Sequence, residues 1–307
     1  RNDSIQIALN RVPRADVLRI DLTADEVTRQ RQLAAIMTAK DSRGRLGHLR
    51  AILMGRKQPQ FTKKPIEIEF KTQLNESQKA AVKFALSAED LAIIHGPPGT
   101  GKTTTVAELI VQAIHRSEKV LACAPSNTAV DNLLDRLVRA GTRVVRIGHP
   151  ARITERLRNY SLDGLVEEHE NTTVIKDMIR EAEALFRQSE KWTRAKPQRG
   201  ARESMKREAK RLMADAKRLE RQAISSILDQ ADVICATTTF NPDTLNDRWF
   251  DLAVIDEACQ STEPGCWVPL LRSERVVLAG DHQQLPPTVL SSEAAQQGFA
   301  KSMMERQ

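Results

Sequence analysis

Residues 96–103 read Gly-Pro-Pro-Gly-Thr-Gly-Lys-Thr, and they stand between an apolar run at 91–95 and a helical pattern at 103–115. This stretch fits G-x-x-x-x-G-K-[ST], the pattern of a phosphate-binding loop, in its required place after a strand and before a helix. The glycines let backbone N–H groups turn inward around phosphate oxygens, and the helix N-terminus adds its positive end. The predicted site is made by Gly96, Pro97, Pro98, Gly99, Thr100, Gly101, Lys102, Thr103 and Thr104.

A second apolar run, at 252–255, ends in two adjacent acids, Asp256 and Glu257. The carboxyl end of a parallel strand lies at the same edge as the loop, so both carboxylates are expected beside the phosphates. We expect Lys102 to reach the β- and γ-phosphates, and Thr103 with Asp256 to hold Mg²⁺. Glu257 is then the candidate general base for an attacking water. This pair favours hydrolysis of ATP over transfer to a small substrate, and the alternative is an incidental acidic pair at a strand end.

Short apolar runs alternate with helical patterns on both sides of the loop. This rhythm predicts an α/β domain with a parallel sheet covered on both faces, the fold class of the RecA-like P-loop proteins. Strands are expected at 91–95, 120–124, 143–147, 232–236, 252–255 and 276–279, and helices at 77–86, 103–115 and 128–140.

The remaining segments break this rhythm, and they suggest a division of the chain. Residues 1–22 alternate as the last strands of a β domain would, and residues 23–55 are expected to be helical with an interruption at Gly44 and Gly47. A basic, Pro-containing linker follows at 56–72, and we call the segment 23–72 the stalk. The sheet domain takes 73–150 and 231–307, and 151–230 forms a charged helical insertion with helices at 166–191 and 202–228. In the stalk, Thr23 and Glu26 are spaced as a capping box, and apolar residues recur at helical spacing at Val27, Leu33, Ile36 and Met37.

The composition is that of a chain with an ordinary hydrophobic core: 307 residues, of which 40% are hydrophobic. No stretch reaches the roughly 18 consecutive apolar residues of a membrane helix. The four cysteines form no C-x-x-C pair, and we expect reduced, structural thiols. A cytoplasmic location follows, or a nuclear one in a eukaryote.

The positive charge is concentrated in one segment. Residues 187–222 hold 13 Lys or Arg against 5 Asp or Glu, while the whole chain has a net charge of +7. Such a cluster suits a binder of phosphate backbones, and a solvated helix face is the alternative.

Further motifs surround the loop in a fixed order. They are Leu-Asn-Glu-Ser-Gln at 74–78, Ala-Pro-Ser-Asn-Thr-Ala-Val-Asp at 124–131, Asp-Glu-Ala-Cys-Gln at 256–260 and Gly-Asp-His-Gln-Gln-Leu-Pro-Pro at 280–287. Together with the loop, this set resembles the superfamily 1 helicases, and within them the up-frameshift-like group 1B of the immunoglobulin-mu-binding type. The resemblance covers about residues 74–307 and extends less securely over 23–72.

The resemblance implies roles for the matching residues. Gln78, with Asn75 near it, would read the adenine edge, although a surface Gln at a helix start is the alternative. Gln284 would contact the γ-phosphate or the attacking water, and Asp281 would link that contact to the nucleic-acid site. The strand would be held by Pro125, Ser126, Asn127 and Thr128, and by Thr237, Thr238 and Thr239. Without the family, the three threonines are simply a β-prone strand end.

The resemblance also implies a partner for this half of the site. Such helicases need a second RecA-like domain, which supplies arginines to the γ-phosphate, and no such segment lies within 1–307. We therefore expect weak ATP hydrolysis by this chain alone, as part of a motor that moves 5′ to 3′ on single-stranded DNA or RNA. Two alternatives stay open: a motor attached to a nuclease or other effector, and a binding module without turnover.

Overall fold

The computed structural model describes residues 25–190, 200–289 and 291–307. Within them, six parallel strands form one sheet in the order β1-β6-β5-β2-β4-β3, which confirms the predicted α/β class. The expected strands at 1–22 lie outside the described residues. The strands are β1 (Leu91–His95), β2 (Val120–Ala124), β3 (Val144–Ile147), β4 (Val233–Thr237), β5 (Phe250–Ile255) and β6 (Ser273–Gly280).

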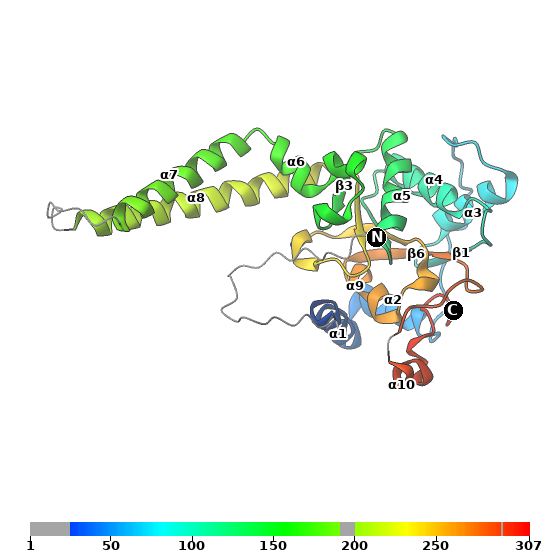
Figure 1. Ribbon diagram of the computed structural model, residues 1–307. Helices are drawn as coiled ribbons and strands as arrows, with labels where there is room; N and C mark the ends of the chain where they lie inside the picture. Colours follow the sequence, from blue (N-terminus) through cyan, green and yellow to red (C-terminus); the bar gives the residue numbers. More distant parts are fainter. Residues whose placement is uncertain (1–24, 191–199, 290) are drawn as a thin grey trace, which may run out of the picture.

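Helices cover both faces of this sheet (Figure 1). Because neighbouring residues of a strand point to opposite faces, Ala122 belongs to the core under one helical layer and Cys123 to the core under the other. One layer contains α3 (Glu76–Ser87), α4 (Lys102–His115) and α5 (Asn127–Arg139). The other contains α1 (Glu26–Asp41), α2 (Gly44–Leu53) and α9 (Glu263–Leu270).

Short helices complete these layers. They are the 3₁₀ turns Pro150–Arg152, Glu155–Tyr160, Pro242–Leu245 and Ala258–Gln260, together with α10 (Ser292–Ala294) and the turn Ala295–Phe299. All four cysteines are free and buried, as predicted, and burial raises the pKa of the Cys235 thiol to about 12. In the described part of the chain, no helix has the length and apolar character that would let it cross a membrane.

The stalk is two helices, α1 and α2, separated at Ser42 and Arg43, so the expected interruption lies directly before Gly44. The predicted capping box is wrong: Asp25 caps α1, and its carboxylate accepts a bond of 3.0 Å from the backbone N–H of Thr28. The orientation of α1 is also unexpected. Its buried residues are alanines, whereas its large apolar side chains face the solvent.

The segment from 56 to 72 contains neither helix nor regular strand, as a linker should, but it is fastened to the sheet domain. The carboxylate of Glu108 on α4 is fully buried, and it accepts bonds of 2.9 Å from the backbone N–H groups of both Lys71 and Thr72. Gln112 donates from its side chain to Glu69 O at 2.7 Å. A buried carboxylate is stable only when such donors satisfy it.

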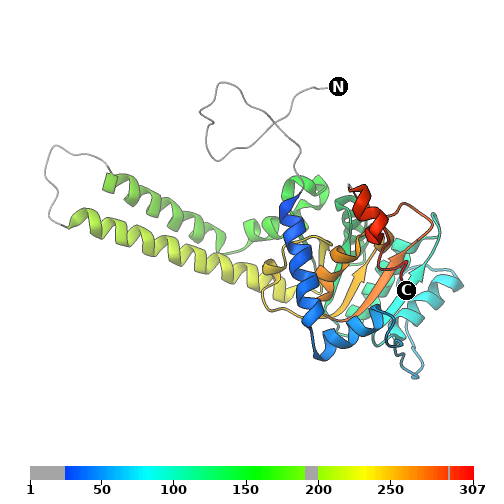
Figure 2. The same ribbon diagram turned by 90° about the horizontal axis from the view of Figure 1, so that it is seen from below.

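Three helices lie between β3 and β4: α6 (Leu162–Glu168), α7 (Thr172–Glu190) and α8 (Ala201–Gln230). The single helix expected at 166–191 is therefore two. Figures 1 and 2 show α7 and α8 side by side, extending away from the sheet. Ala209, Ala216 and Ala223 of α8 are fully buried and spaced by seven, while Leu212 and Leu219 are half-buried. Small side chains at a heptad position let two helices approach closely.

Candidate nucleotide-binding site

The phosphate loop joins β1 to α4, and its glycines have the backbone that the motif requires. Gly99 and Gly101 have φ angles of +77° and +80°, which L-residues with a Cβ rarely adopt. A Cβ on Gly101 would also lie 2.6 Å from Nε2 of Gln78. The first turn of α4 then starts at Lys102, so its free N–H groups point into the loop.

The functional side chains of the loop meet the acids of β5, as the sequence predicts. Lys102 is buried, and its Nζ donates to Gly96 O at 2.7 Å. The hydroxyl of Thr103 donates to Oδ2 of Asp256 at 3.1 Å. A lysine that folds back over the loop, with a hydroxyl and a carboxylate beside it, is a donor set that fits the phosphates and Mg²⁺ of ATP.

The two acids differ in their surroundings. Asp256 is only 1% exposed, and burial, followed by the nearby charge of Glu257, raises its pKa to about 6. Its Oδ1 accepts the backbone N–H of Glu257 at 3.0 Å. Glu257 has a left-handed backbone with φ of +52°, and its Oε2 accepts a bond of 3.3 Å from the side chain of Gln260. Non-glycine residues in this region store strain, and they cluster at functional sites.

Gln78 lies at a helix start, and its side chain also lies beside the phosphate loop, so both interpretations of this residue apply. With Asn75 it forms a capping box at the start of α3: Gln78 N–H donates to Asn75 Oδ1 at 2.9 Å, and Asn75 N–H donates to Gln78 Oε1 at 2.9 Å. Its Nε2 also donates to Thr100 O at 2.9 Å. The amide therefore lies against the phosphate loop, where the adenine-reading role would place it.

Gln284 is held at the same edge by Asp281, which is buried. Its Nε2 donates to Asp281 Oδ2 at 3.0 Å, and the backbone N–H of Gln283 donates to Oδ1 at 3.0 Å. These two bonds, in that order, lower the pKa of the Asp281 carboxyl. Sequence reasoning missed a further neighbour, since Nε2 of His95 lies 3.2 Å from Asp281 Oδ1. The pairing of β1 with β6, which sets His95 opposite Gly280, was the signal that could have revealed it.

The residues expected to hold a nucleic-acid strand lie around two adjacent hollows. One hollow, of 320 Å³, is lined by Pro125, Ser126, Thr238 and Thr239, and the other, of 500 Å³, by Asn127, Thr237 and Thr239. Thr128 is exposed but lines neither. Thr238 is only 3% exposed and accepts a hydroxyl bond from Ser261 at 3.2 Å. Arg31 on α1, which sequence reasoning missed, donates to Thr239 O at 3.0 Å and lines the second hollow.

A parallel six-stranded sheet with this loop and this acidic strand end defines a nucleotide-binding P-loop domain of the RecA-like class. The comparison with known families agrees: the model described as an AAA domain matches residues 73–292, and the chain belongs to that family.

Its relatives include proteins named as helicases. The chain is 41% identical to the DNA-binding protein SMUBP-2 of Mus musculus over 99% of its own length, and 41% identical to the DNA polymerase alpha-associated DNA helicase A of Schizosaccharomyces pombe over 72%. An ATP-dependent helicase of Methanocaldococcus jannaschii is 35% identical over 94% of the chain. These findings confirm the resemblance to superfamily 1 helicases. The chain spans 31%, 33% and 48% of these relatives' lengths, respectively.

Proposed function

We propose that this chain is the first motor domain of an ATP-dependent helicase or translocase that acts on single-stranded nucleic acid. The observation that carries the proposal is the meeting of Lys102, Thr103 and Asp256 at one sheet edge, with a second acid beside them and Gln284 at the same edge. The names of the relatives support the helicase class.

When ATP binds, Lys102 would exchange Gly96 O for oxygens of the β- and γ-phosphates. Thr103 and Asp256 hold Mg²⁺, which supplies positive charge to the phosphate oxygens. Coordination requires the ionised form of Asp256, and a pKa of about 6 leaves that form dominant at neutral pH. The buried carboxylate would thus gain a second positive neighbour, in addition to Lys102.

Glu257, whose backbone is left-handed, then accepts the proton of the attacking water. Gln284 contacts the γ-phosphate or that water. Asp281 holds the amide of Gln284 in place and carries its displacement toward the nucleic-acid track. Gln78 and Asn75 contact the adenine.

The two hollows beside the ends of β2 and β4 are proposed as the track of the strand. Hydroxyls and amides there suit phosphate oxygens, which carry no sequence information, so the contacts do not distinguish DNA from RNA. The exposed cations of α7 and α8 would add contacts to the backbone. Movement 5′ to 3′ follows from the resemblance, and it requires the second RecA-like domain.

The proposed division of the chain into domains also follows from the resemblance to the helicase family. Residues 73–150 and 231–307 form the motor domain, 151–230 its helical insertion, and 23–72 the stalk with its linker. The buried free thiols fit a reducing compartment, so we place the protein in the cytoplasm or, in a eukaryote, the nucleus.

A binding experiment tests the function directly. We expect a fluorescent ATP analogue to bind the chain in the presence of Mg²⁺ and not in EDTA, and a labelled oligo(dT) or oligo(U) to bind with an affinity that changes when ATP is added. Tight binding of the oligonucleotide with an affinity that ATP does not change would favour a nucleic-acid-binding module that does not hydrolyse ATP. Robust hydrolysis stimulated by nucleic acid in 1–307 would contradict the need for a second motor domain.

A further inference from the structure

Helix α1 exposes the side chains that a surface helix normally buries. Leu33, Ile36 and Met37 are 47%, 38% and 60% exposed, whereas the small residues Ala35 and Ala39 form its buried face. The three exposed residues lie at positions i, i+3 and i+4, so they make one stripe along the helix. An apolar stripe that faces solvent marks an interaction site more often than it marks chance.

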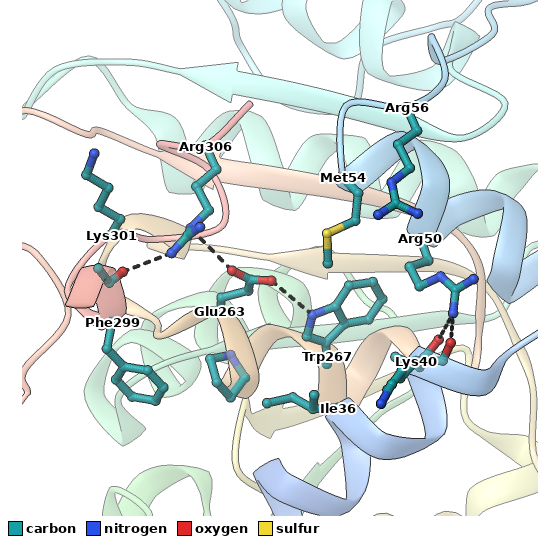
Figure 3. Close-up of a pocket in the computed structure, with 13 residues that line it drawn as sticks. Ile36, Lys40, Arg50, Met54, Arg56, Glu263, Trp267, Phe299, Lys301 and Arg306 are labelled. Atoms are coloured by element: carbon teal, nitrogen blue, oxygen red, sulfur yellow. Dashed lines mark hydrogen bonds and ion pairs between the residues drawn. The ribbon is translucent and has the colours of Figure 1, made fainter. Parts of the chain in front are cut away.

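A cavity of 490 Å³ lies at the C-terminal end of this stripe, between α1, α2, α9 and the segment 298–306 (Figure 3). Ile36 belongs both to the stripe and to the cavity. Figure 3 shows the ring of Trp267 between Met54 and Ile36, with Phe299 at the far side. The apolar lining is made by Ile36, Ala39, Met54, Pro264, Trp267 and Phe299.

The charges around this cavity are unbalanced. Glu263 is the one acid in its lining, and it is already paired with Arg306 at 3.2 Å and bonded to the indole N–H of Trp267 at 3.5 Å. Within the described residues, the other lining cations Lys40, Arg56 and Lys301 are exposed and have no acidic partner, while Arg50 donates to Ala39 O at 2.7 Å. The site therefore offers an apolar floor with unpaired positive charge at its rim, and it suits a ligand with apolar anchors and negative charge.

We propose that the stripe of Leu33, Ile36 and Met37 and this cavity, together the stalk groove, form a docking site for an acidic amphipathic helix of a partner protein. The stripe and the cavity run from Leu33 to Lys40, about 10 Å along α1, which matches the span of helical anchors at i, i+4 and i+7. A nucleic-acid strand fits less well, because its phosphates need charge along a groove and its bases need polar donors on the floor. The inference stands apart from the proposed ATP-dependent function.

The probe is a fluorescein-labelled helical peptide of 14 residues with Leu, Phe and Leu at i, i+4 and i+7 and Glu on its flanks. We expect saturable binding by anisotropy, and no binding of a control peptide with Lys in place of Glu. The double variant Arg56→Glu and Lys301→Glu should weaken binding by about 10-fold or more, and Phe299→Ser should weaken it as well. Lys63→Glu with Lys64→Glu, the same change in charge on the exposed linker, should leave the affinity unchanged.

Retained binding of the ATP analogue shows that each variant is folded, since none of these side chains lies at the phosphate loop. Equal binding of the acidic and basic peptides would overturn the proposal, as would equal weakening by Lys63→Glu with Lys64→Glu. If the rim variants instead reduce the affinity for oligo(dT) and leave the peptide unaffected, the stalk groove is a nucleic-acid surface and the proposal is wrong.

Discussion

The nucleotide edge of the sheet and the α7–α8 hairpin both carry charged side chains, but they hold them in different ways. At the edge, Lys102 and Asp256 are buried, and each is bonded to a neighbour. On the hairpin, Lys206, Lys210 and Lys217 are exposed, and no acidic partner stands beside them in the described residues. A charge fixed in a low-dielectric site acts strongly at one point, whereas exposed charges act together and are screened by salt.

This contrast predicts two kinds of response to substitution. Single changes at the edge should remove a step of the chemistry, because each buried group is held in one place by its neighbours. Changes on the hairpin should act in small increments that depend on ionic strength. The largest effects should therefore come from the edge and the smallest from the hairpin.

The largest effect is expected for Glu257→Gln, which keeps the shape of the side chain and removes the base. ATP hydrolysis by the whole motor should fall about 10²–10⁴-fold, the usual contribution of general base catalysis, while ATP still binds. Single-turnover hydrolysis and binding of the ATP analogue measure the two separately. Full turnover in this variant would show that Glu257 is not the general base. It would contradict the predicted difference between the edge and the hairpin where that difference should be largest.

Lys102→Ala should lower the rate by about 10²–10³-fold, because a positioned positive charge at the phosphates is lost from a buried site. Affinity for the ATP analogue should fall in parallel, which Glu257→Gln should not cause. The matched control is Lys83→Ala, which removes an exposed lysine from α3. Equal losses of rate and of affinity for the ATP analogue in Lys102→Ala and Lys83→Ala would show that the buried lysine contributes no more than an exposed one.

Asp256 gives the edge a pH dependence. Its pKa in the folded chain is raised from 3.8 to about 6, so folding favours the protonated form. The free energy of unfolding of the nucleotide-free chain should therefore fall as pH rises from about 4 to about 6, by about 3 kcal/mol at most. Urea unfolding across this range, compared with Asp256→Asn, isolates the effect. The same change of the free energy of unfolding with pH in both proteins would show that other groups cause it.

The smallest effect is expected on the hairpin. Replacing Lys206, Lys210 and Lys217 by Ala should weaken binding of oligo(dT) by about 10-fold at low salt and much less at high salt. The slope of log affinity against log salt should drop by about 0.7 for each phosphate that the protein no longer neutralises. Lys63→Ala with Lys64→Ala, exposed cations of the linker, serves as the control. An unchanged slope would leave the hairpin as a solvated charged surface.

The sequence identified most of the nucleotide edge because local patterns determine it. β1 and β2 have the predicted bounds, and the loop and the acids meet as the spacing implies. β6 begins three residues earlier than predicted, since Arg275 looked like loop but is buried in an ion pair with Glu118 at 2.5 Å. That partner belongs to a distant segment, so no local pattern could show it.

Two other features could not be predicted because they also depend on contacts between distant segments. His95 reaches Asp281 only because β1 pairs with β6. The periodic apolar residues of α1 predicted a helix correctly but did not show which face is buried, because α9 packs against the alanines between them. Residue patterns indicate which elements form, while the choice of face and of partner depends on tertiary packing.

The carboxylate of Glu108 connects the phosphate loop mechanically to a distant part of the chain. α4 begins at Lys102, where phosphate would bind, and further along the same helix Glu108 holds the backbone of Lys71 and Thr72. The two points are about 9 Å apart along a helix that does not bend easily. Any tilt of the first turn of α4 on binding or release of phosphate would therefore be transmitted to the segment that leads back to α2. In this way α4 would couple the nucleotide site to the stalk.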